Sequence, residues 1–286
     1  MRVSSQMMSD RVKNNLFRQA EQLFKIEERI VSGKRINRAS DDPIGIGEVL
    51  NYRKTLSSLD QYQDNISKAK LHIDTTEQIL DTVTQLLSDA KDIASDPNVE
   101  MRDTFAEQVT TIREQVLQMA NSQINGSYIF AGNLTDTPPF DNTGAYVGDT
   151  GDKSFLVGDG IEIGLEADGS RVFQGSSDIF TVLSDLEAAL TAGDATAIDN
   201  QLTPIADAIE QINTVRVENS GRYKRLEATD THYESFKFNV EDLLSRTEDA
   251  DMAESILDLQ AQQTAYEATM ATSAKMITPS LIDFLK

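Results

Sequence analysis

The stretch from Tyr52 to Ala94, "YRKTLSSLDQYQDNISKAKLHIDTTEQILDTVTQLLSDAKDIA", decides the fold because its apolar residues recur every seven positions. Two interleaved sets make the repeat: Tyr52, Leu59, Ile66, Ile73, Leu80, Leu87 and Ala94, and then Tyr62, Ala69, Thr76, Val83 and Ala90. A sustained repeat of this kind is typical of a long helix packed as in a coiled coil. We predict one helix from Pro43 to Ser95, ended by Asp96-Pro97, because proline disfavours helix at the preceding residue.

The second half of the chain carries a matching repeat. Its members are Ile198, Ile205, Ile212, Leu226, Tyr233 and Val240, with Asn219 as a polar exception. The repeat predicts a helix from Ala195 to Thr247, similar in length to the first. Two long helices with one apolar stripe each bury those stripes best against each other, so we expect an antiparallel helical rod. A shorter helix should follow the first, with one apolar face made of Phe105, Val109, Ile112, Val116 and Met119.

Residues 127–177 differ from the rest, with many glycines, two prolines and several turn signals. Within them, "GIEIGLEADGSRVF" (residues 160–173) alternates inward Ile161, Ile163 and Leu165 with outward glutamates. We expect a β-hairpin that turns at Asp168-Gly169, because Asp-Gly suits the positive φ of a tight turn. A small β domain would then interrupt the helical chain at the far end of the rod.

The two ends of the chain also carry amphipathic patterns. Such helices are unstable alone in water, because helix stability comes mostly from packing. We therefore expect the two ends to pack on each other, on a neighbouring subunit, or on both, and to be disordered in the free monomer. The predicted assembly interface consists of Leu16, Phe17, Leu23, Phe24, Ile30, Ile256, Leu259, Tyr266, Met270, Ile277, Leu281 and Phe284.

The segment "SGKRINRASDDP" (residues 32–43) is predicted to be a joint between the end helix and the rod. Gly33 suits the residue just past a helix end, Asp42 suits an N-cap, and Pro43 suits the first helical position. Between them lie a basic set and an acidic set: Lys34, Arg35 and Arg38, and then Asp41 and Asp42. These charges predict either a contact with a neighbouring subunit or a solvated loop.

Five segments follow from these patterns. Residues 1–42 and 250–286 are the two assembly helices, residues 43–126 and 178–249 are the halves of the rod, and residues 127–177 are a small outer β domain. The fold class is mainly α. Charge is uneven along the chain: residues 127–210 hold fifteen acids against two bases, whereas residues 1–38 hold nine bases against four acids.

Composition excludes several classes of protein. The formal net charge of −21 argues against nucleic-acid binding, which needs a basic face. The chain has no cysteine, so a disulfide framework and a thiolate nucleophile are excluded. We expect no membrane insertion, since no apolar run approaches the roughly 18 residues of a span. The first residues lack the apolar core of a cleaved secretory signal.

No pattern of an enzyme survives its spacing test. His72 and His232 flank seam residues of the long helices and start no zinc-protease motif. "GIGEVL" lacks the strand and third glycine of a dinucleotide fingerprint, and "SGKRIN" lacks the first glycine and the Ser/Thr of a P-loop. The aspartates at 149, 152 and 159 match no EF-hand spacing. We therefore expect no catalytic, cofactor or metal site.

Several motifs resemble the flagellin family, and within it the hook–filament junction proteins. They are "MRVSSQMM" at the start, "SGKRINRASDDP", "NGSYIFAGNLTDTPPF" (125–140), "YVGD" (146–149) and the ending "EDADMAESILDLQAQQTAYEATMATSAKMITPSLIDFL". The resemblance implies terminal helices that pair to line an inner tube, a rod in the next shell, and a β domain facing outward. It also implies extracellular localisation in the flagellum, after export by the flagellar secretion apparatus.

The resemblance further implies which partners to expect. These are neighbouring copies of the chain, the other hook–filament junction protein, flagellin, and a cytoplasmic export chaperone. The expected function is a structural adaptor ring that joins hook to filament through packing of the terminal helices. Two alternatives stay open: flagellin itself, the filament subunit, and a secreted module whose β domain binds a surface ligand.

Overall fold

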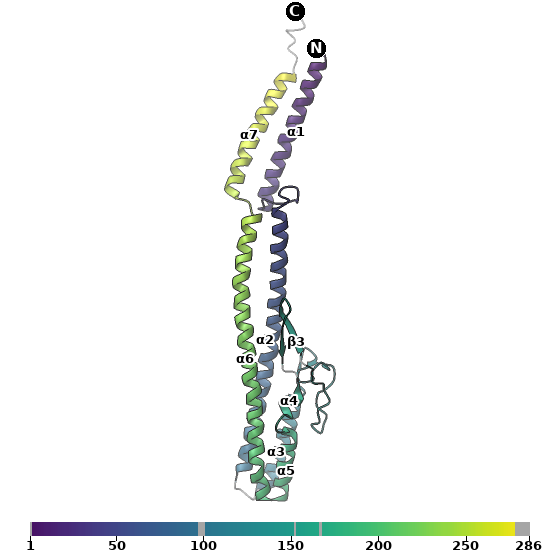
Figure 1. Cartoon of the computed structure of the whole chain (residues 1–286), viewed down its shortest axis with the longest axis vertical. Helices are drawn as coiled ribbons and strands as arrows, with labels where there is room; N and C mark the ends of the chain where they lie inside the picture. The colour runs from purple at the N-terminus through teal and green to yellow at the C-terminus, as the bar shows by residue number, and fades with distance from the viewer. Residues whose placement is uncertain (1, 97–100, 152, 166–167, 278–286) are drawn as a thin grey trace, which may run out of the picture. The chain divides into compact units, whose positions relative to one another are not determined.

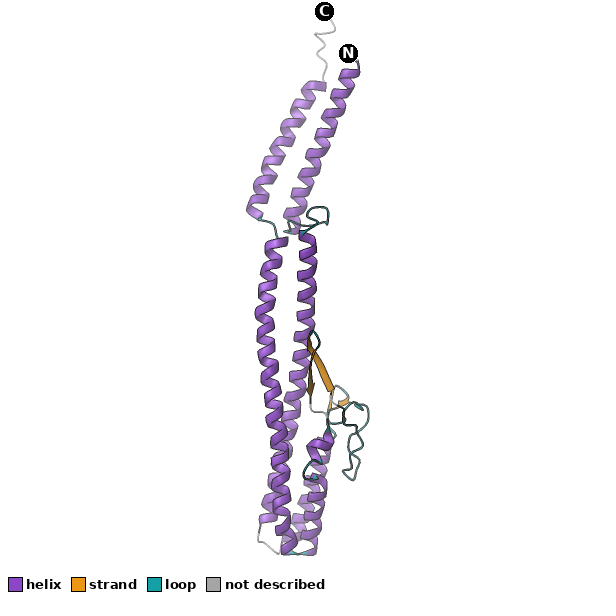
Figure 2. Ribbon diagram, in the orientation of Figure 1, coloured by secondary structure: helices purple, strands orange, loops and turns teal. Residues whose placement is uncertain are grey.

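A computed structural model describes residues 2–96, 101–151, 153–165 and 168–277 (Figure 1). Its helices are α1 (Arg2–Ser32), α2 (Gly45–Ser95), α3 (Arg102–Ala120), α4 (Gly169–Phe173), α5 (Ile179–Ala192), α6 (Ala195–Glu248) and α7 (Met252–Ile277). Its strands are β1 (Gln123–Ile124), β2 (Ser127–Tyr128), β3 (Lys153–Gly158) and β4 (Ile161–Leu165). Helices dominate the described chain (Figure 2), which confirms the predicted mainly α fold.

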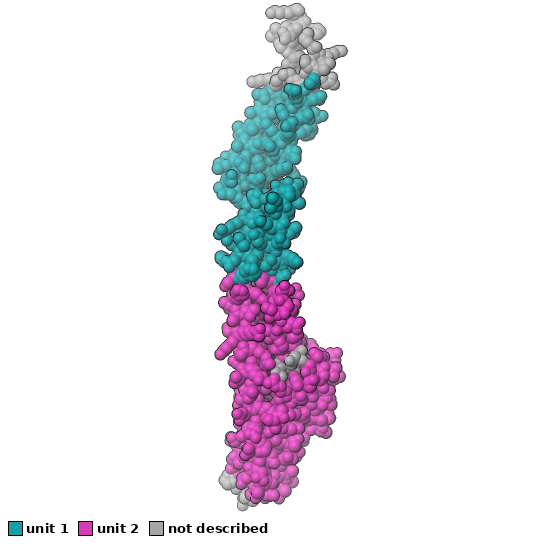
Figure 3. Space-filling view, viewed as in Figure 1, with its two compact units in different colours: residues 1–58, 236–286 teal, residues 59–235 magenta. Residues whose placement is uncertain are grey.

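The chain divides into two compact units (Figure 3). Unit 1 comprises residues 1–58 and 236–286, and unit 2 comprises residues 59–235. The long helices α2 and α6 each contribute to both. Unit 1 holds the terminal helices α1 and α7 together with the segment that joins α1 to α2.

The two predicted long helices are confirmed. α2 and α6 have nearly the predicted bounds, and the seam residues Ile66, Leu80 and Leu87 of α2 are fully buried in unit 2. The polar exception in the α6 seam, Asn219, is only 3% exposed, and its Oδ1 accepts a hydrogen bond from the Arg222 guanidinium at 3.0 Å. A buried amide with a partner costs little stability.

The core of unit 2 is built by the long helices α2 and α6 together with α3, α5 and the short α4. α3 was predicted, but α5 was not, although its boundaries are marked by Asp178, whose carboxylate caps the first turn, and by Gly193, whose φ is 69°. The larger buried residues of this core include Val83, Leu87, Val109, Val116, Leu183, Leu186, Ile205 and Ile212. The rod is therefore thicker in this unit than two stripes alone predict.

The predicted hairpin pairing is wrong. β4 pairs with the preceding strand β3, and the turn between them contains Asp159 and Gly160, whose φ is +67°. Asp168 instead caps α4, where its carboxylate accepts hydrogen bonds from the backbone amides of Ser170 and Arg171. Asp159-Gly160 and Asp168-Gly169 both suit a tight turn, and the strand β3 before the first pair makes that one the turn of the hairpin. Ile163 and Leu165 are buried as expected, but Ile161 lies near the turn and is 49% exposed.

The predicted place of the hairpin, at the far end of the rod, is also wrong. Its apolar face packs on the middle of α2 and α6, and the shared cluster contains Ile66, Ala69, Ile73, Val157, Ile163, Leu165 and Leu226. The Tyr233 hydroxyl donates a hydrogen bond to the Val157 carbonyl at 2.7 Å. A two-stranded hairpin is unstable alone, so it lies where helices can cover its apolar face.

The "NGSYIFAGNLTDTPPF" stretch forms an aromatic cluster in unit 2. The rings of Phe130 and Phe140 both contact Phe173, with centroids 5.1 and 5.3 Å apart, and Phe140 also contacts Phe180. The Tyr146 hydroxyl donates to the Asp149 carbonyl at 2.6 Å, and burial raises the pKa of this phenol to about 12. The motif therefore packs the loops onto the helical core.

Candidate functional site

The terminal helices α1 and α7 form an antiparallel pair in unit 1 (Figure 1). Each contributes a row of partly or fully buried residues with alternating spacings of three and four, which is the spacing of a coiled-coil seam. The α1 row is Val12, Leu16, Gln19, Leu23, Ile26 and Ile30, and the α7 row is Ser255, Leu259, Gln262, Tyr266, Thr269 and Ser273. Predicted interface residues on both helices therefore face each other.

The seam of this pair is weak because α7 supplies mostly polar or small residues to it. Ser255 and Ser273 are its buried members, at 2% and 6% exposure. Gln262 Nε2 donates to the Gln19 carbonyl and to Gln22 Oε1, both at 3.3 Å. Polar residues in a seam fix the register of two helices at a cost in stability. The polar residues thus fix the register of α1 on α7, but they add little to the stability of the pair.

A second apolar row of α1 is not covered by α7. Phe17, Phe24 and Val31 are 62%, 58% and 87% exposed. On α7, Ile256 and Met270 are 46% and 49% exposed. At 3.6 residues per turn both rows fall on the same side of the antiparallel pair. Periodicity separates Leu16, Leu23 and Ile30 from Phe17, Phe24 and Val31 as two heptad rows, but only the structure shows which row faces α7.

The outer row of α1 belongs to a short repeat. Leu16-Phe17-Arg18 is followed seven residues later by Leu23-Phe24-Lys25. In each triplet the leucine lies in the seam, whereas the phenylalanine and the base are exposed. Beside the first triplet lies an open groove of about 370 Å³, lined by Ser9, Val12, Lys13, Leu16, Phe17, Ala20 and Tyr266. One side of the pair is therefore an uncovered apolar surface with basic neighbours.

Three members of the predicted interface cannot be placed. The side chain of Ile277, at the end of α7, lies outside the described side chains, and Leu281 and Phe284 lie outside the described residues.

The joint begins at Gly33 and is capped by Asp42 as the sequence predicts, but the prediction of Pro43 as the first helical residue is wrong. α1 ends at Ser32, and Gly33 has a φ of +70°. The Asp42 carboxylate accepts hydrogen bonds from the amides of Ile44 (3.2 Å) and Gly45 (2.9 Å), and its carbonyl accepts from Ile46. The amides of Gly45, first, and Ile44, together with the Arg35 guanidinium, lower the pKa of the Asp42 carboxyl group. α2 itself begins at Gly45, and Pro43 lies in the preceding turn.

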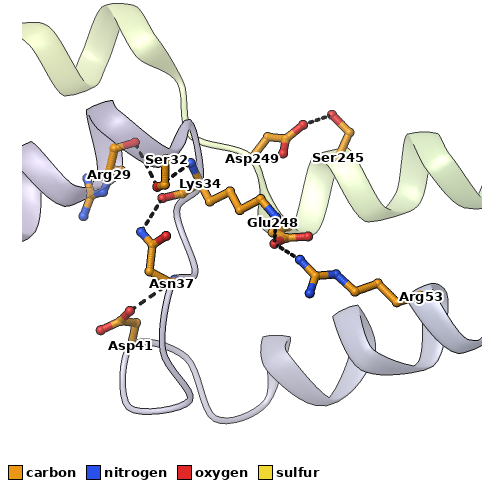
Figure 4. Close-up of polar contacts among 9 residues, drawn as sticks. All are labelled: Arg29, Ser32, Lys34, Asn37, Asp41, Arg53, Ser245, Glu248 and Asp249. Atoms are coloured by element: carbon orange, nitrogen blue, oxygen red, sulfur yellow. Dashed lines mark hydrogen bonds and ion pairs between the residues drawn. The ribbon is translucent and has the colours of Figure 1, made fainter.

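Glu248, the last residue of α6, lies at the centre of the joint (Figure 4). Its side chain is 5% exposed, and its Oε1 lies 2.7 Å from Lys34 Nζ and 2.5 Å from an Arg53 guanidinium nitrogen. The Glu248 carbonyl accepts from the Arg35 amide at 2.7 Å, and the Ala250 amide donates to the Gly33 carbonyl at 2.9 Å. The two connections thus pair with each other.

The remaining charges of the joint are also engaged within the chain. The Arg35 guanidinium donates to the Thr247 carbonyl at 2.7 Å, and an Arg38 guanidinium nitrogen lies 3.0 Å from Glu28. Asp41 accepts from the backbone amide of Arg38 at 2.8 Å. The basic side chains therefore bind partners within the chain. The sequence had left open a contact with a neighbouring subunit or a solvated loop, and neither describes this role.

Sequence reasoning missed the partners of the joint. Glu248 and Arg53 lie far apart in the sequence, and only folding brings their side chains together. Ile36, at 2% exposure, is the buried apolar residue of the loop. Gly45 packs so closely that a Cβ there would lie 2.7 Å from Ile36 and 2.5 Å from Asp42. In the sequence, the two nearby glycines Gly45 and Gly47 were the feature that could have indicated this close packing.

The described residues contain no group of three or more acidic or histidine side chains arranged to hold a metal ion. Among the described helices, none is both long and apolar enough to cross a membrane. His72 is a buried side chain of the rod at 7% exposure.

Comparison with known proteins agrees with this arrangement. Residues 3–135 match the family model described as the bacterial flagellin N-terminal helical region. Flagellar hook-associated protein 3 of Salmonella typhimurium is 26% identical over 98% of this chain and 98% of its own length.

Two solved structures share the fold. FlgL of Bacillus cereus superposes with a TM-score of 0.63 at 21% identity, covering 68% of this chain and 99% of that one. The flagellar junction protein FlgL of Legionella pneumophila superposes with a TM-score of 0.58 at 15% identity, covering 72% and 100%. The chain is thus similar over its full length to flagellar hook-associated protein 3, and residues 3–135 match the flagellin N-terminal helical region.

Proposed function

We propose that this chain is a structural subunit of the bacterial flagellum that joins the hook to the filament. The observation that carries the proposal is the uncovered side of the terminal-helix pair, where Phe17, Phe24 and Val31 remain exposed. Three large apolar side chains exposed along one side of α1, beside the exposed Ile256 and Met270 of α7, indicate a surface for protein contacts. The full-length likeness to hook-associated protein 3 supports the same function.

The residues assigned to assembly fall into two groups. The seam residues Leu16, Leu23 and Ile30 hold α1 on α7, and the outer residues Phe17 and Phe24 contact neighbouring subunits. On α7 the corresponding residues are Leu259 and Tyr266 in the seam and Ile256 and Met270 outside it. The joint sets the direction in which the pair leaves α2 and α6, because Glu248 binds cations from two segments of the chain.

The proposed partners follow from a place at the junction. Copies of the chain form a ring, with the other hook–filament junction protein on one side and flagellin on the other. Before assembly, the exposed apolar rows need protection, which a cytoplasmic export chaperone would supply. We further propose export by the flagellar secretion apparatus without a cleaved signal, which would place the protein outside the cell. No catalytic step is part of the proposal.

Flagellin itself is the alternative within the same family. It would need the same terminal helices, so the helices alone do not separate the two. The likeness over the full length to a hook-associated protein, rather than over the helical region alone, favours the junction.

A deletion of the gene, scored by electron microscopy, tests the proposal. We expect hooks without filaments, and flagellin released into the medium, because filament growth has no base. Complete filaments on the deletion strain would refute the junction role. Absence of both hook and filament would place the protein at an earlier stage.

A further inference from the structure

The turn between β1 and β2 contains the only Asn-Gly pair of the sequence, Asn125-Gly126. Asn125 has a φ of 52°, which makes it the only residue other than glycine with a positive φ among the described residues, and Gly126 has a φ of 81°. A type I′ turn requires positive φ at both central residues, and Asn-Gly is a preferred pair for it. Both residues are exposed. The pair thus forms a tight hairpin turn at the surface of unit 2.

The backbone amide of Gly126 is free to act as a nucleophile. Within the described part of the chain this amide donates no hydrogen bond, and the Asn125 side chain has no partner. Nothing lies within 4 Å of the place that a Cβ on Gly126 would take, so the nitrogen is not shielded. β1 and β2 share only two residue pairs, and a hairpin this short opens at low free energy. When it opens, the Asn125 side chain can approach the amide that follows it.

Two other asparagines precede a small residue, serine, but their side chains are held. The Asn121 side chain donates to the Phe140 carbonyl and accepts from the Phe140 amide, each at 3.0 Å. Asn219 is 3% exposed, and its Oδ1 accepts from the Arg222 guanidinium. A side-chain carbonyl that is held by a partner cannot turn toward the next backbone nitrogen. Asn125 therefore combines a small following residue with an unbound side chain, as neither of these does.

We propose that Asn125 is a site of spontaneous covalent modification. The Gly126 nitrogen attacks the side-chain carbonyl carbon of Asn125, so that a new C–N bond forms, the bond to the side-chain nitrogen breaks, and ammonia leaves with the amide proton. Water then adds across one of the two C–N bonds of the resulting succinimide ring. Opening at the original backbone bond leaves isoaspartate, and opening at the new bond leaves aspartate. Water is the only other reactant, and the chain gains one negative charge.

The isoaspartate product changes the backbone itself. Its main chain runs through the former side chain and is longer by one methylene group, so the two residue pairs of the hairpin cannot keep their register. At the end of this hairpin, the Tyr128 amide donates to the Thr135 carbonyl at 2.9 Å and the Ile129 amide to the Ser122 carbonyl at 3.1 Å. Phe130 of the aromatic cluster comes next. The modification should therefore loosen the link between α3 and the aromatic cluster.

Ageing of the purified full-length chain in mildly alkaline buffer tests the reaction. Peptide mass spectrometry should locate a gain of about one mass unit at Asn125, and an isoaspartate-specific methyltransferase should label the same peptide. Asn121 is the control within the same sample. It should react roughly tenfold more slowly, because both ends of its side-chain amide are hydrogen-bonded.

Two variants separate the change of backbone from the change of charge. Asn125→Gly removes the reacting amide and keeps a pair that suits the turn, so it should not change with time. Asn125→Asp carries the charge of the product on an unaltered backbone. Hydrogen exchange at the Ile129 amide should rise roughly fivefold in the aged wild type, because the hairpin opens more often. It should stay at the starting rate in aged Asn125→Gly and in fresh Asn125→Asp.

Each remaining outcome overturns a step of the proposal. A folded chain that stays unmodified while the urea-unfolded chain reacts would mean that the ordered turn protects Asn125. Equal rates at Asn121 and Asn125 would mean that the hydrogen bonds of the side chain do not select the site. Unchanged exchange at Ile129 in the modified chain, or an equal rise in fresh Asn125→Asp, would refute the effect on the backbone. None of these outcomes depends on the junction role, so the two proposals fail independently.

Discussion

Lys34 Nζ and Glu248 Oε1 lie 2.7 Å apart and join the connection that follows α1 to the end of α6 (Figure 4). Arg53, from the first turns of α2, binds the same carboxylate oxygen. One buried carboxylate therefore ties three segments of unit 1 together.

The first prediction concerns this carboxylate. Glu248→Gln keeps the size of the side chain but removes its charge, so Lys34 and Arg53 lose their partner. Breaking a buried pair costs more than a surface pair, but both cations here are nearly half exposed and can return to water. We expect a loss of about 1–2 kcal/mol in the free energy of unfolding of unit 1.

Limited proteolysis measures the effect at the right place. The Glu248→Gln variant should be cut faster at the joint than the wild type. The control is Glu241→Gln, an exposed acid of the same helix, which should be cut at the wild-type rate. Equal rates for Glu248→Gln and the wild type would mean that the backbone pairing alone holds the joint.

The second prediction uses two glycines at the start of α2. Gly45→Ala would place a Cβ 2.7 Å from Ile36 and 2.5 Å from Asp42, whereas nothing lies within 4 Å of a Cβ at Gly47. We expect Gly45→Ala to destabilise unit 1 by about 1–3 kcal/mol through overpacking. Gly47→Ala should stabilise it by about 0.5–1 kcal/mol, because alanine favours helix. Urea unfolding of both variants checks this, and the same sign for both would contradict it.

The third prediction concerns pH. Burial, and then the charge of Lys153, lower the pKa of His72 from 6.5 to about 4. The unfolded chain therefore binds a proton at a higher pH than the folded chain does. Stability attributable to His72 is complete above pH 6.5 and falls as the pH drops toward 4, by about 3 kcal/mol in all.

Urea unfolding at pH 7, 5.5 and 4 measures that slope. His72→Gln should flatten it, whereas His232→Gln, an exposed residue on α6, should keep the wild-type slope. A slope that persists unchanged in His72→Gln would assign the acid sensitivity to other groups.

The fourth prediction concerns order in the free monomer. The seam of α1 and α7 is partly polar, whereas the core of unit 2 contains fully buried residues such as Leu87 and Leu183. Regions with few buried apolar contacts open at low free energy. In hydrogen exchange of the monomer, amides of α1 and α7 should exchange at least a hundredfold faster than those of α2 around Leu87. In assembled flagella the difference should shrink, and its absence in the monomer would contradict the expectation.

The fifth prediction separates assembly from folding. Leu23→Asp puts a charge into the seam of the terminal pair, so the pair should not form. We expect loss of filaments, with the thermal unfolding of unit 2 unchanged, since Leu23 belongs to unit 1. The control is Asn14→Asp, an exposed position on the same helix. Normal flagella from Leu23→Asp would show that assembly does not need the seam between α1 and α7.

The long helices could be predicted because their evidence is local and repetitive. A seven-residue repeat over six or more turns fixes both the element and its buried face, and Gly33 and Asp42 mark boundaries by their own chemistry. The strand pairing failed because two Asp-Gly pairs satisfy the same turn rule. Only the need of Val157 and Ile163 for a helical surface selects the pairing and the position of the hairpin.

The candidate site was predictable in composition but not in geometry. Periodicity identified Leu16 and Phe17 as apolar interface residues, yet both rows satisfy it. Which row faces α7 depends on the partner helix, whose own pattern is weak. No sequence pattern indicates the role of Glu248, because that role depends on cations from two distant segments of the chain. Local patterns therefore find the surfaces, and only the fold assigns their partners.

Localisation on isolated flagella tests directly whether the chain lies between hook and filament. A short peptide tag inserted between Asn142 and Thr143, an exposed loop of unit 2, can be labelled with gold and imaged by electron microscopy. We expect one labelled band at the boundary between hook and filament, in a strain whose motility the tagged chain restores. Label distributed along the whole filament would identify a filament subunit and contradict the junction role.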